Sequence, residues 1–199
     1  MRAFREHTGI VAPLDRSSVD TDQIIPKQFL KRIERTGYGE FLFYDWRYTS
    51  DGKPQPDFVL NQPQYAGASI LVAGKNFGCG SSREHAAWAL SDYGFRVVIA
   101  PTFADIFNTN AGNNGILLVK LPEEEVATFM QRAQNSPGYK LHVSLLDKRV
   151  WDDEGFSAKF EIDEFRRTCL LEGLDEIGLT LKHDAEISAY EQRRSSRGW

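Results

Sequence analysis

The passage from residue 70 to residue 90 constrains the fold most, because an apolar run there meets a glycine-rich loop and then an alanine-rich segment. The run Ile70–Ala73 is typical of a buried strand, and the segment after Ser81 has helical spacing of its apolar residues. Three glycines lie between the two, Gly74, Gly78 and Gly80. Glycine lets a backbone turn sharply and lets a ligand approach without a Cβ in the way. The pattern therefore predicts a strand, a loop and a helix N-terminus.

The predicted helix start carries groups that attract an anion. Ser81 and Glu84 fit a capping box, which predicts free backbone N–H groups at residues 82–84. These groups, the positive end of the helix dipole and the Arg83 guanidinium converge on one small volume, where a carboxylate fits. A loop that binds nothing is the open alternative. Lys75 precedes the last glycine, so the segment is not a P-loop, and it lacks the dinucleotide-binding spacing.

Composition excludes several classes of protein. The chain has 199 residues, which is enough for one domain with a core of its own. Its formal net charge is −4, so a broad nucleic-acid-binding face is not expected. Residues 1–7 are charged without an apolar core, and no run is long enough to span a bilayer. We therefore expect no signal peptide, no membrane partner and a cytoplasmic location.

The two cysteines limit the metal chemistry of the chain. Cys79 and Cys169 provide neither a disulfide framework nor metal-ligand spacing. An iron–sulfur cluster normally needs three or four thiolates, so we expect no cofactor to be bound by this chain alone. Cys79 has two interpretations. It is either a nucleophile with His85 as its base or, as the residue statistics favour, an incidental thiol.

Two charged segments of the N-terminal part leave alternatives open. Three aspartates between residues 15 and 22 could orient a cation or a basic group, or could form Asx turns. Residues 27–47 mix basic and aromatic side chains, a composition found in proteins that bind single-stranded nucleic acid. The acidic total and the helical spacing of residues 29–33 favour a packed helix whose basic residues are free for a small anion.

The remaining pattern predicts one α/β domain spanning residues 1–199, with a mixed sheet and flanking helices. Strands are expected at residues 8–14, 70–73, 96–100 and 116–121. A hairpin is expected from residues 139–151 and 157–162, across the turn at 152–155. Helices are expected at residues 103–114 and 122–135 and, in the C-terminal part, at 164–172 and 184–194, before a frayed tail at 195–199.

The chain resembles a known family over nearly its whole length. The resemblance is most specific in three segments, Val19–Leu30, Asn76–Ala86 and Gly173–Leu181. The family is the small subunits of bacterial 3-isopropylmalate dehydratases, in the aconitase superfamily. The resemblance implies a swivelling β/β/α domain like the mobile C-terminal domain of aconitase. It also implies a large-subunit partner that carries a [4Fe–4S] cluster, and a small dicarboxylic hydroxy-acid substrate.

The activity implied by the resemblance is that of a hydro-lyase that works only with its large subunit. It interconverts 2-isopropylmalate and 3-isopropylmalate in leucine biosynthesis, by removing water to give 2-isopropylmaleate and adding it back. One alternative is the small subunit of a related hydro-lyase of the citraconate/methylmalate or homoaconitate type. The other is a non-catalytic RNA-binding module, which the acidic charge disfavours.

The resemblance also implies roles for individual residues. Ser81 matches the catalytic base, and Ser82 and Arg83 match contacts to substrate carboxylates. Asp22 matches an active-site aspartate that supports the catalytic groups. A serine is a poor base unless its alkoxide is stabilised. Lowering the pKa of its hydroxyl by one unit requires about 1.4 kcal/mol of stabilisation of the alkoxide relative to the hydroxyl. If Ser81 caps its own helix, its oxygen is occupied, so either Gly80 or Ser82 is the N-cap or the cap bond breaks on substrate binding.

The loop Phe29–Gly37 is implied to lie near the substituent that distinguishes isopropylmalate from citrate. Arg35 matches a substrate-binding arginine from this region, with Arg32 as the other candidate. Leu118 departs from the family pattern, in which proline is common at this position. We interpret this departure as packing variation outside the site.

Overall fold

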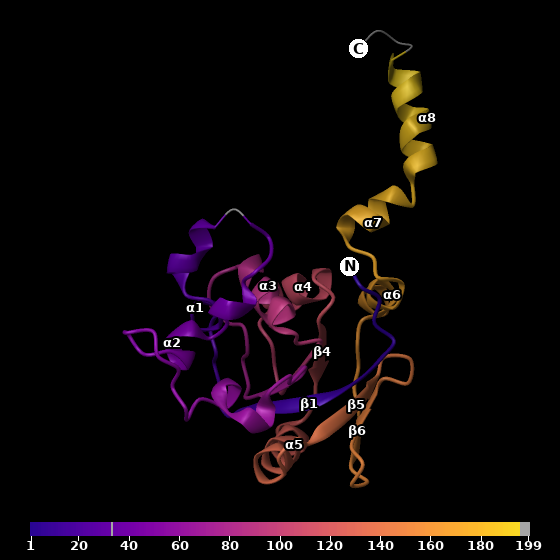
Figure 1. Ribbon diagram of the computed structural model, residues 1–199. Helices are drawn as coiled ribbons and strands as arrows, with labels where there is room; N and C mark the ends of the chain where they lie inside the picture. The colour runs from indigo at the N-terminus through magenta and orange to yellow at the C-terminus, as the bar shows by residue number, and fades with distance from the viewer. Residues whose placement is uncertain (33, 196–199) are drawn as a thin grey trace.

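A computed structural model describes residues 1–32 and 34–195, and within them the strands form one mixed seven-stranded sheet (Figure 1). The strand order is β4-β3-β2-β1-β5-β6-β7. The first four strands are parallel and the last three run antiparallel to their neighbours. The strands are β1 (Glu6–Leu14), β2 (Ile70–Ala73), β3 (Val97–Ala100), β4 (Leu117–Lys120), β5 (Lys140–Ser144), β6 (Arg149–Trp151) and β7 (Ser157–Lys159). The predicted α/β class is confirmed.

Helices cover both faces of the sheet, with α3 and α4 on one side and α5 on the other (Figure 1). The longer ones are α3 (Glu84–Tyr93), α4 (Asp105–Asn113), α5 (Glu123–Asn135), α6 (Glu164–Glu172), α7 (Glu176–Leu181) and α8 (Asp184–Ser195). Before β2 the chain forms short turns of helix: α1 (Thr21–Ile24), α2 (Tyr44–Arg47), and 3₁₀ turns at Lys27–Lys31, Gly39–Phe41, Val59–Asn61 and Pro63–Tyr65.

Strand β2 is buried on both faces, and this is why its sequence is continuously apolar. Its side chains alternate between two cores because successive residues of a strand point to opposite faces. Leu71 belongs to the core that also contains Leu90 of α3 and Phe107 of α4. Ile70 belongs to the core that contains Phe129 of α5. The sheet is therefore the middle layer of three.

The parallel strands bring three loops together at their carboxyl ends. The loop after β1 bonds to the glycine-rich loop after β2, through Ser18 N to Lys75 O at 2.7 Å and Gly78 N to Val19 O at 2.8 Å. The loop after β3 joins them through Phe77 N to Thr102 O at 3.1 Å. Ligand sites of parallel sheets form at this edge. The fold therefore places residues 15–22 and 74–83 side by side.

Some predicted elements differ from the structure. The strand predicted at residues 139–151 is split into β5 and β6 by a turn in which Lys148 has a φ of 51°, so a three-stranded meander replaces the hairpin. The helix predicted around residues 29–33 is the 3₁₀ turn Lys27–Lys31, and residue 33 lies outside the described residues. Helix α7 was not predicted. Of the expected tail, Ser195 ends α8, and residues 196–199 lie outside the described residues.

A helix that crosses a bilayer must be both long and apolar. Among residues 1–32 and 34–195, no helix has the length and apolar character needed to cross a bilayer.

Gly78 provides a test of how tightly the glycine-rich loop packs. A Cβ at Gly78 would lie 2.2 Å from Cγ of Phe107, whereas Gly138 has the same left-handed backbone and no atom within 4 Å of its Cβ position. We expect Gly138→Ala to cost about 1–2 kcal/mol of backbone strain, and Gly78→Ala to cost about 1–3 kcal/mol more from the steric overlap. Urea unfolding measures both variants. Equal losses of stability would show that Phe107 does not confine the loop.

Candidate active site

Helix α3 begins at Glu84, with Arg83 as its N-cap and no side chain bonded to its first N–H groups. The capping box predicted between Ser81 and Glu84 is therefore wrong, and neither Gly80 nor Ser82 is the N-cap. Uncapped N–H groups at the positive end of a ten-residue helix are available to an anion.

The capping box of this region lies instead in α1. Oδ1 of Asp20 accepts from the backbone N–H of Gln23 at 2.7 Å, and Oε1 of Gln23 accepts from the backbone N–H of Asp20 at 2.9 Å. A second bond fixes the start of α1, because Thr21 N donates to the Cys79 carbonyl at 2.9 Å. Helix α1 is therefore attached to the glycine-rich loop.

Ser81 is held by its backbone and leaves its side chain free. The buried hydroxyl of Thr21 donates to the Ser81 carbonyl at 2.9 Å. The Ser81 side chain is exposed, and its hydroxyl has no hydrogen-bond partner among the described residues; the same is true of Ser82. Ser81 therefore does not cap helix α3, and its hydroxyl oxygen is free to contact a ligand.

Arg83 and Asp22 form a two-pronged ion pair between the two loops. Nη1 of Arg83 donates to Oδ1 of Asp22, and Nη2 donates to Oδ2 at 3.0 Å. The Arg83 side chain is only 16% exposed, so its position is well defined. Within the described chain Asp22 is its one hydrogen-bond partner, which leaves Nε–H and the outer N–H groups for a second carboxylate.

Arg35 lies at the same helix end, whereas Arg32 is engaged elsewhere. Nη2 of Arg35 is 3.6 Å from Oε1 of Glu84, and its guanidinium lies over the Trp88 ring at 5.1 Å. Arg32 forms an ion pair with Glu40 at 3.3 Å and covers neighbouring aromatic rings. Arg35 makes no hydrogen bond to Ser81, Ser82 or Arg83 within the described residues. The structure therefore brings Arg35 beside the site without direct contact.

The three glycines of the loop have different roles. A Cβ at Gly74 would lie 2.6 Å from the Arg16 carbonyl oxygen, and Gly78 packs against Phe107. Gly74 and Gly78 therefore allow close packing inside the protein. The glycine pattern of the sequence predicts sharp turns and ligand approach, and it does not predict this packing role. Gly80 has a φ of 90° and is exposed next to Ser81, so it permits the turn that the sequence predicts at the site.

Cys79 does not have the surroundings of a nucleophile. Burial raises the pKa of its thiol, and the nearby Asp20 carboxylate raises it further. Burial lowers the pKa of His85, whose ring packs against Trp88 at a centroid distance of 4.5 Å. No hydrogen bond joins Cys79 to His85 within the described residues. The structure therefore favours the incidental thiol over the Cys–His pair.

The aspartates of the loop after β1 do not form a metal site. Asp20 caps α1, as the Asx-turn interpretation expects, and Asp22 binds the Arg83 guanidinium. In residues 1–32 and 34–195 no group of three or more His, Cys, Asp or Glu side chains could hold a metal ion. The basic-group interpretation therefore holds for Asp22.

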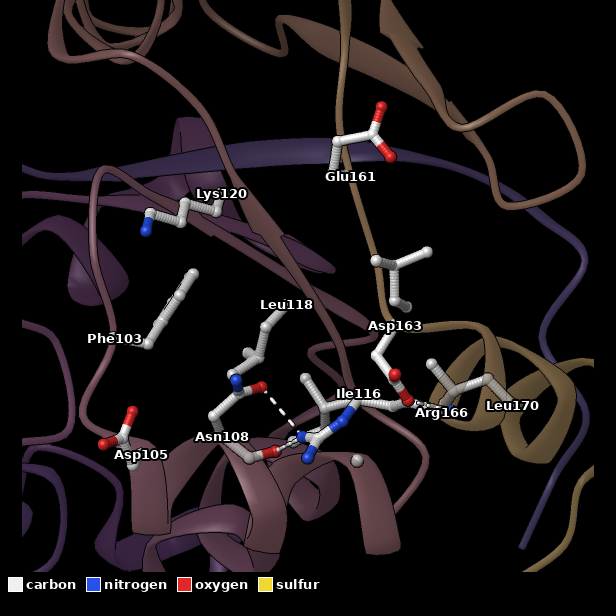
Figure 2. A pocket seen from close by; sticks show the side chains of 12 residues that line it. Phe103, Asp105, Asn108, Ile116, Leu118, Lys120, Glu161, Asp163, Arg166 and Leu170 are labelled. Carbon is white, nitrogen blue, oxygen red and sulfur yellow. Dashed lines mark hydrogen bonds between the residues drawn. The ribbon is translucent and has the colours of Figure 1, made fainter.

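A separate cavity of about 300 Å³ lies between α4, β4 and α6 (Figure 2). Arg166 crosses it and donates to the Asn108 backbone carbonyl and, at 2.9 Å, to the Asn108 side chain. These bonds connect α6 to α4 and use hydrogen-bond donors of Arg166, one of the two cationic side chains that line the cavity with Lys120. Leu118 lines the same cavity, so its departure from the family pattern affects packing at this seam and does not touch the site after β2.

The class of this domain is given by a family model and by a solved structure with the same fold. The model of the family described as "Aconitase C-terminal domain" matches residues 1–124, more than half of the chain. A solved structure of 3-isopropylmalate dehydratase from Methanocaldococcus jannaschii has the same fold, with a TM-score of 0.69 and 24% identity over 93% of this chain and 99% of that one. The domain is thus of the aconitase C-terminal type.

The family within this class follows from closer relatives. Proteins named 3-isopropylmalate dehydratase small subunit are 62% identical in Acidobacterium capsulatum, over 100% of this chain and 94% of that one, and 59% identical in Geobacillus kaustophilus, over 99% and 100%. Two further models match, LeuD_N at residues 127–164 and, at residues 176–197, the C-terminal domain of the 3-isopropylmalate dehydratase small subunit. The chain belongs to the family of 3-isopropylmalate dehydratase small subunits.

The raised pKa of the Cys79 thiol predicts slow alkylation. In a Cys169→Ser background, iodoacetamide at pH 7.5 should modify Cys79 several-fold more slowly than free cysteine, because less thiolate is present. The rate should still be rising above pH 9, and urea should bring it to the rate of a free thiol. A rate in the folded protein that levels off below pH 8 would indicate an activated cysteine instead.

Proposed function

We propose that this chain is the small subunit of a 3-isopropylmalate dehydratase and contributes the base and the carboxylate-binding groups to a site shared with the large subunit. The enzyme interconverts 2-isopropylmalate and 3-isopropylmalate through 2-isopropylmaleate, in leucine biosynthesis. The observation that carries this proposal is the unpartnered Ser81 hydroxyl beside Arg83 at the uncapped start of α3. Membership of the small-subunit family supports it.

Dehydration requires removal of a proton from the carbon next to a carboxylate, and Ser81 is the proposed base. Its hydroxyl is exposed, while the bond from Thr21 to its carbonyl fixes its backbone. The helix N-terminus stabilises an alkoxide by about 0.3–2 kcal/mol. Since each pKa unit requires about 1.4 kcal/mol, that contribution alone is too small. The remaining stabilisation comes from Arg83 and from a closed site that excludes water.

Arg83 and Ser82 form the proposed clamp for a substrate carboxylate. Asp22 holds the guanidinium by one edge and so orients the other edge toward the substrate. The paired arrangement also keeps the charge of Arg83 compensated before the substrate binds, which reduces the cost of burying it. Asp22 therefore acts as a positioning residue in this proposal.

Arg35 is the proposed second contact to the substrate. Glu84 and the Trp88 ring hold it at the start of α3, next in space to the site and on the loop Phe29–Gly37. Arg32 is the weaker candidate because Glu40 and two aromatic rings already engage it. This loop is the part of the chain proposed to contact the isopropyl group.

The donor set of this chain does not fit an iron–sulfur cluster. Its two thiols, the half-buried Cys79 and the buried Cys169, are fewer than the three or four that a cluster normally needs. A cluster ligand must be a thiolate. We assign the [4Fe–4S] cluster to the large subunit, and residues 1–199 to one swivelling domain that closes over it. The steps assigned to this chain are proton removal and carboxylate binding, and the proposed location is the cytoplasm.

Replacing Ser81 tests the assignment of the base. In the enzyme reconstituted with its large subunit, Ser81→Ala should lower kcat by about 10²–10⁴-fold, the usual contribution of a general base, with little change in KM. Ser82→Ala is the matched control. It removes one proposed hydrogen bond to the substrate from a neighbouring exposed serine and should change kcat/KM by about tenfold at most. The readout is the absorbance of 2-isopropylmaleate under anaerobic conditions.

Two results would contradict this account. If Ser81→Ala keeps more than a tenth of the wild-type kcat, Ser81 is not the base. If the wild-type enzyme turns over citraconate and not 2-isopropylmalate, it is a related hydro-lyase acting on a smaller substrate.

A further inference from the structure

The C-terminal arm, which we define as residues 176–195, carries apolar side chains on its surface. Ile177 is 69% exposed, Leu181 60% and Tyr190 59%. No residue of α7 or α8 is buried. Figure 1 shows α8 projecting away from the sheet and the helices that cover it. An arm of this kind exposes the residues that a folded chain normally packs.

Polar contacts fasten α7 to the rest of the protein. Nδ2 of Asn113 in α4 donates to Oε1 of Glu176 at 3.0 Å, and the N-terminal ammonium of Met1 lies 3.8 Å from Oδ2 of Asp175, the N-cap of α7. Lys182, just after α7, forms an ion pair with Glu172 of α6. An ordinary surface helix turns its apolar side chains toward the core and its polar ones toward water. In α7 only Leu179 among the apolar side chains is half-buried, whereas Ile177 and Leu181 are exposed and open to contact with a second molecule.

The length of helix α8 also indicates that the arm packs against a partner. It has 12 residues and buries none of them. Isolated helices shorter than about 12–15 residues are marginally stable in water, and most helices in proteins depend on packing of one face. A covering partner supplies that packing.

The position of the arm identifies the partner. Ile177 lines a cleft of about 310 Å³ together with Arg35 and Glu84. Ile177 thus places the start of the arm at the rim of the proposed active site, and in the proposed function that rim is covered by the large subunit. A second copy of this chain seated there would occupy the rim and compete with the large subunit.

The family matches point the same way. The match to the aconitase C-terminal domain ends at residue 124, whereas residues 176–197 match a model described for the small subunit. The arm therefore lies in a segment matched by a small-subunit model, and a small subunit is held to its large subunit by non-covalent contacts.

We propose that the C-terminal arm docks on the large subunit through Ile177, Leu181 and Tyr190, and that it contributes affinity and no chemistry. This inference rests on the proposed function, because the occupant is the large subunit of the dehydratase. Its effect appears in the dissociation constant of the two subunits and not in the turnover number of the assembled enzyme.

The test is a titration of the large subunit onto the full-length chain, read both by calorimetry and by dehydratase activity. The variant Leu181→Asp/Tyr190→Asp, which changes exposed residues outside the cleft lined by Arg35, should raise Kd at least tenfold, while kcat at saturating large subunit stays within twofold of wild type. The control is Leu146→Asp, which alters an exposed apolar residue in the β5–β6 turn and should leave Kd unchanged. Circular dichroism and thermal unfolding check that the variants are folded.

The outcomes separate this inference from the proposed function. A Kd within twofold of wild type for the double variant overturns the docking role of the arm. Sedimentation velocity that shows wild-type dimers, and only monomers of the double variant, also overturns it, because the occupant is then a second copy. If the wild-type subunits bind each other through the arm but the complex does not turn over 2-isopropylmalate, the docking role stands and the proposed reaction fails.

Discussion

The parallel pairing of β1 with β2 is the constraint on which the site depends. Val11 lies opposite Ile70 and Leu14 opposite Ala73, so the two strands end at the same edge of the sheet. The loops that follow them carry Asp22 and the Ser81–Arg83 segment. Because β2 is buried on both faces, a slip of one residue would exchange its side chains between two differently shaped cores. The register that packs the cores therefore also brings the two loops together.

The electrostatics support the proposal that this chain supplies half of a shared site. The N–H groups at the start of α3 and the exposed Ser81 hydroxyl lie at the surface, next to the mostly buried Arg83 side chain. Two unit charges 4 Å apart interact by about 1 kcal/mol in water and about 4 kcal/mol at an effective dielectric constant of 20. The same groups therefore become much more effective when a second subunit lies over them.

The sequence predicted the main strands and helices well, because they have local signals. The apolar run of β2 and the acidic first turn of α5 are such signals, and the segments Val19–Leu30, Asn76–Ala86 and Gly173–Leu181 identified the family. The N-cap was wrong because Ser81 and Glu84 have capping-box spacing, yet the distant Thr21 fixes the Ser81 carbonyl and the helix starts later. Gly78 packing on Phe107, the positive φ of Lys148 and the outward apolar residues of α7 depend on tertiary contacts that no local pattern records.

The central claim is that the chemistry requires both subunits, with the proton-removing and carboxylate-binding groups on this one. The most direct measurement is an anaerobic assay of 2-isopropylmaleate formation from 2-isopropylmalate by this chain alone, by the cluster-loaded large subunit alone, and by the two mixed. The account predicts activity in the mixture and none in either part. Turnover by either subunit alone would contradict it.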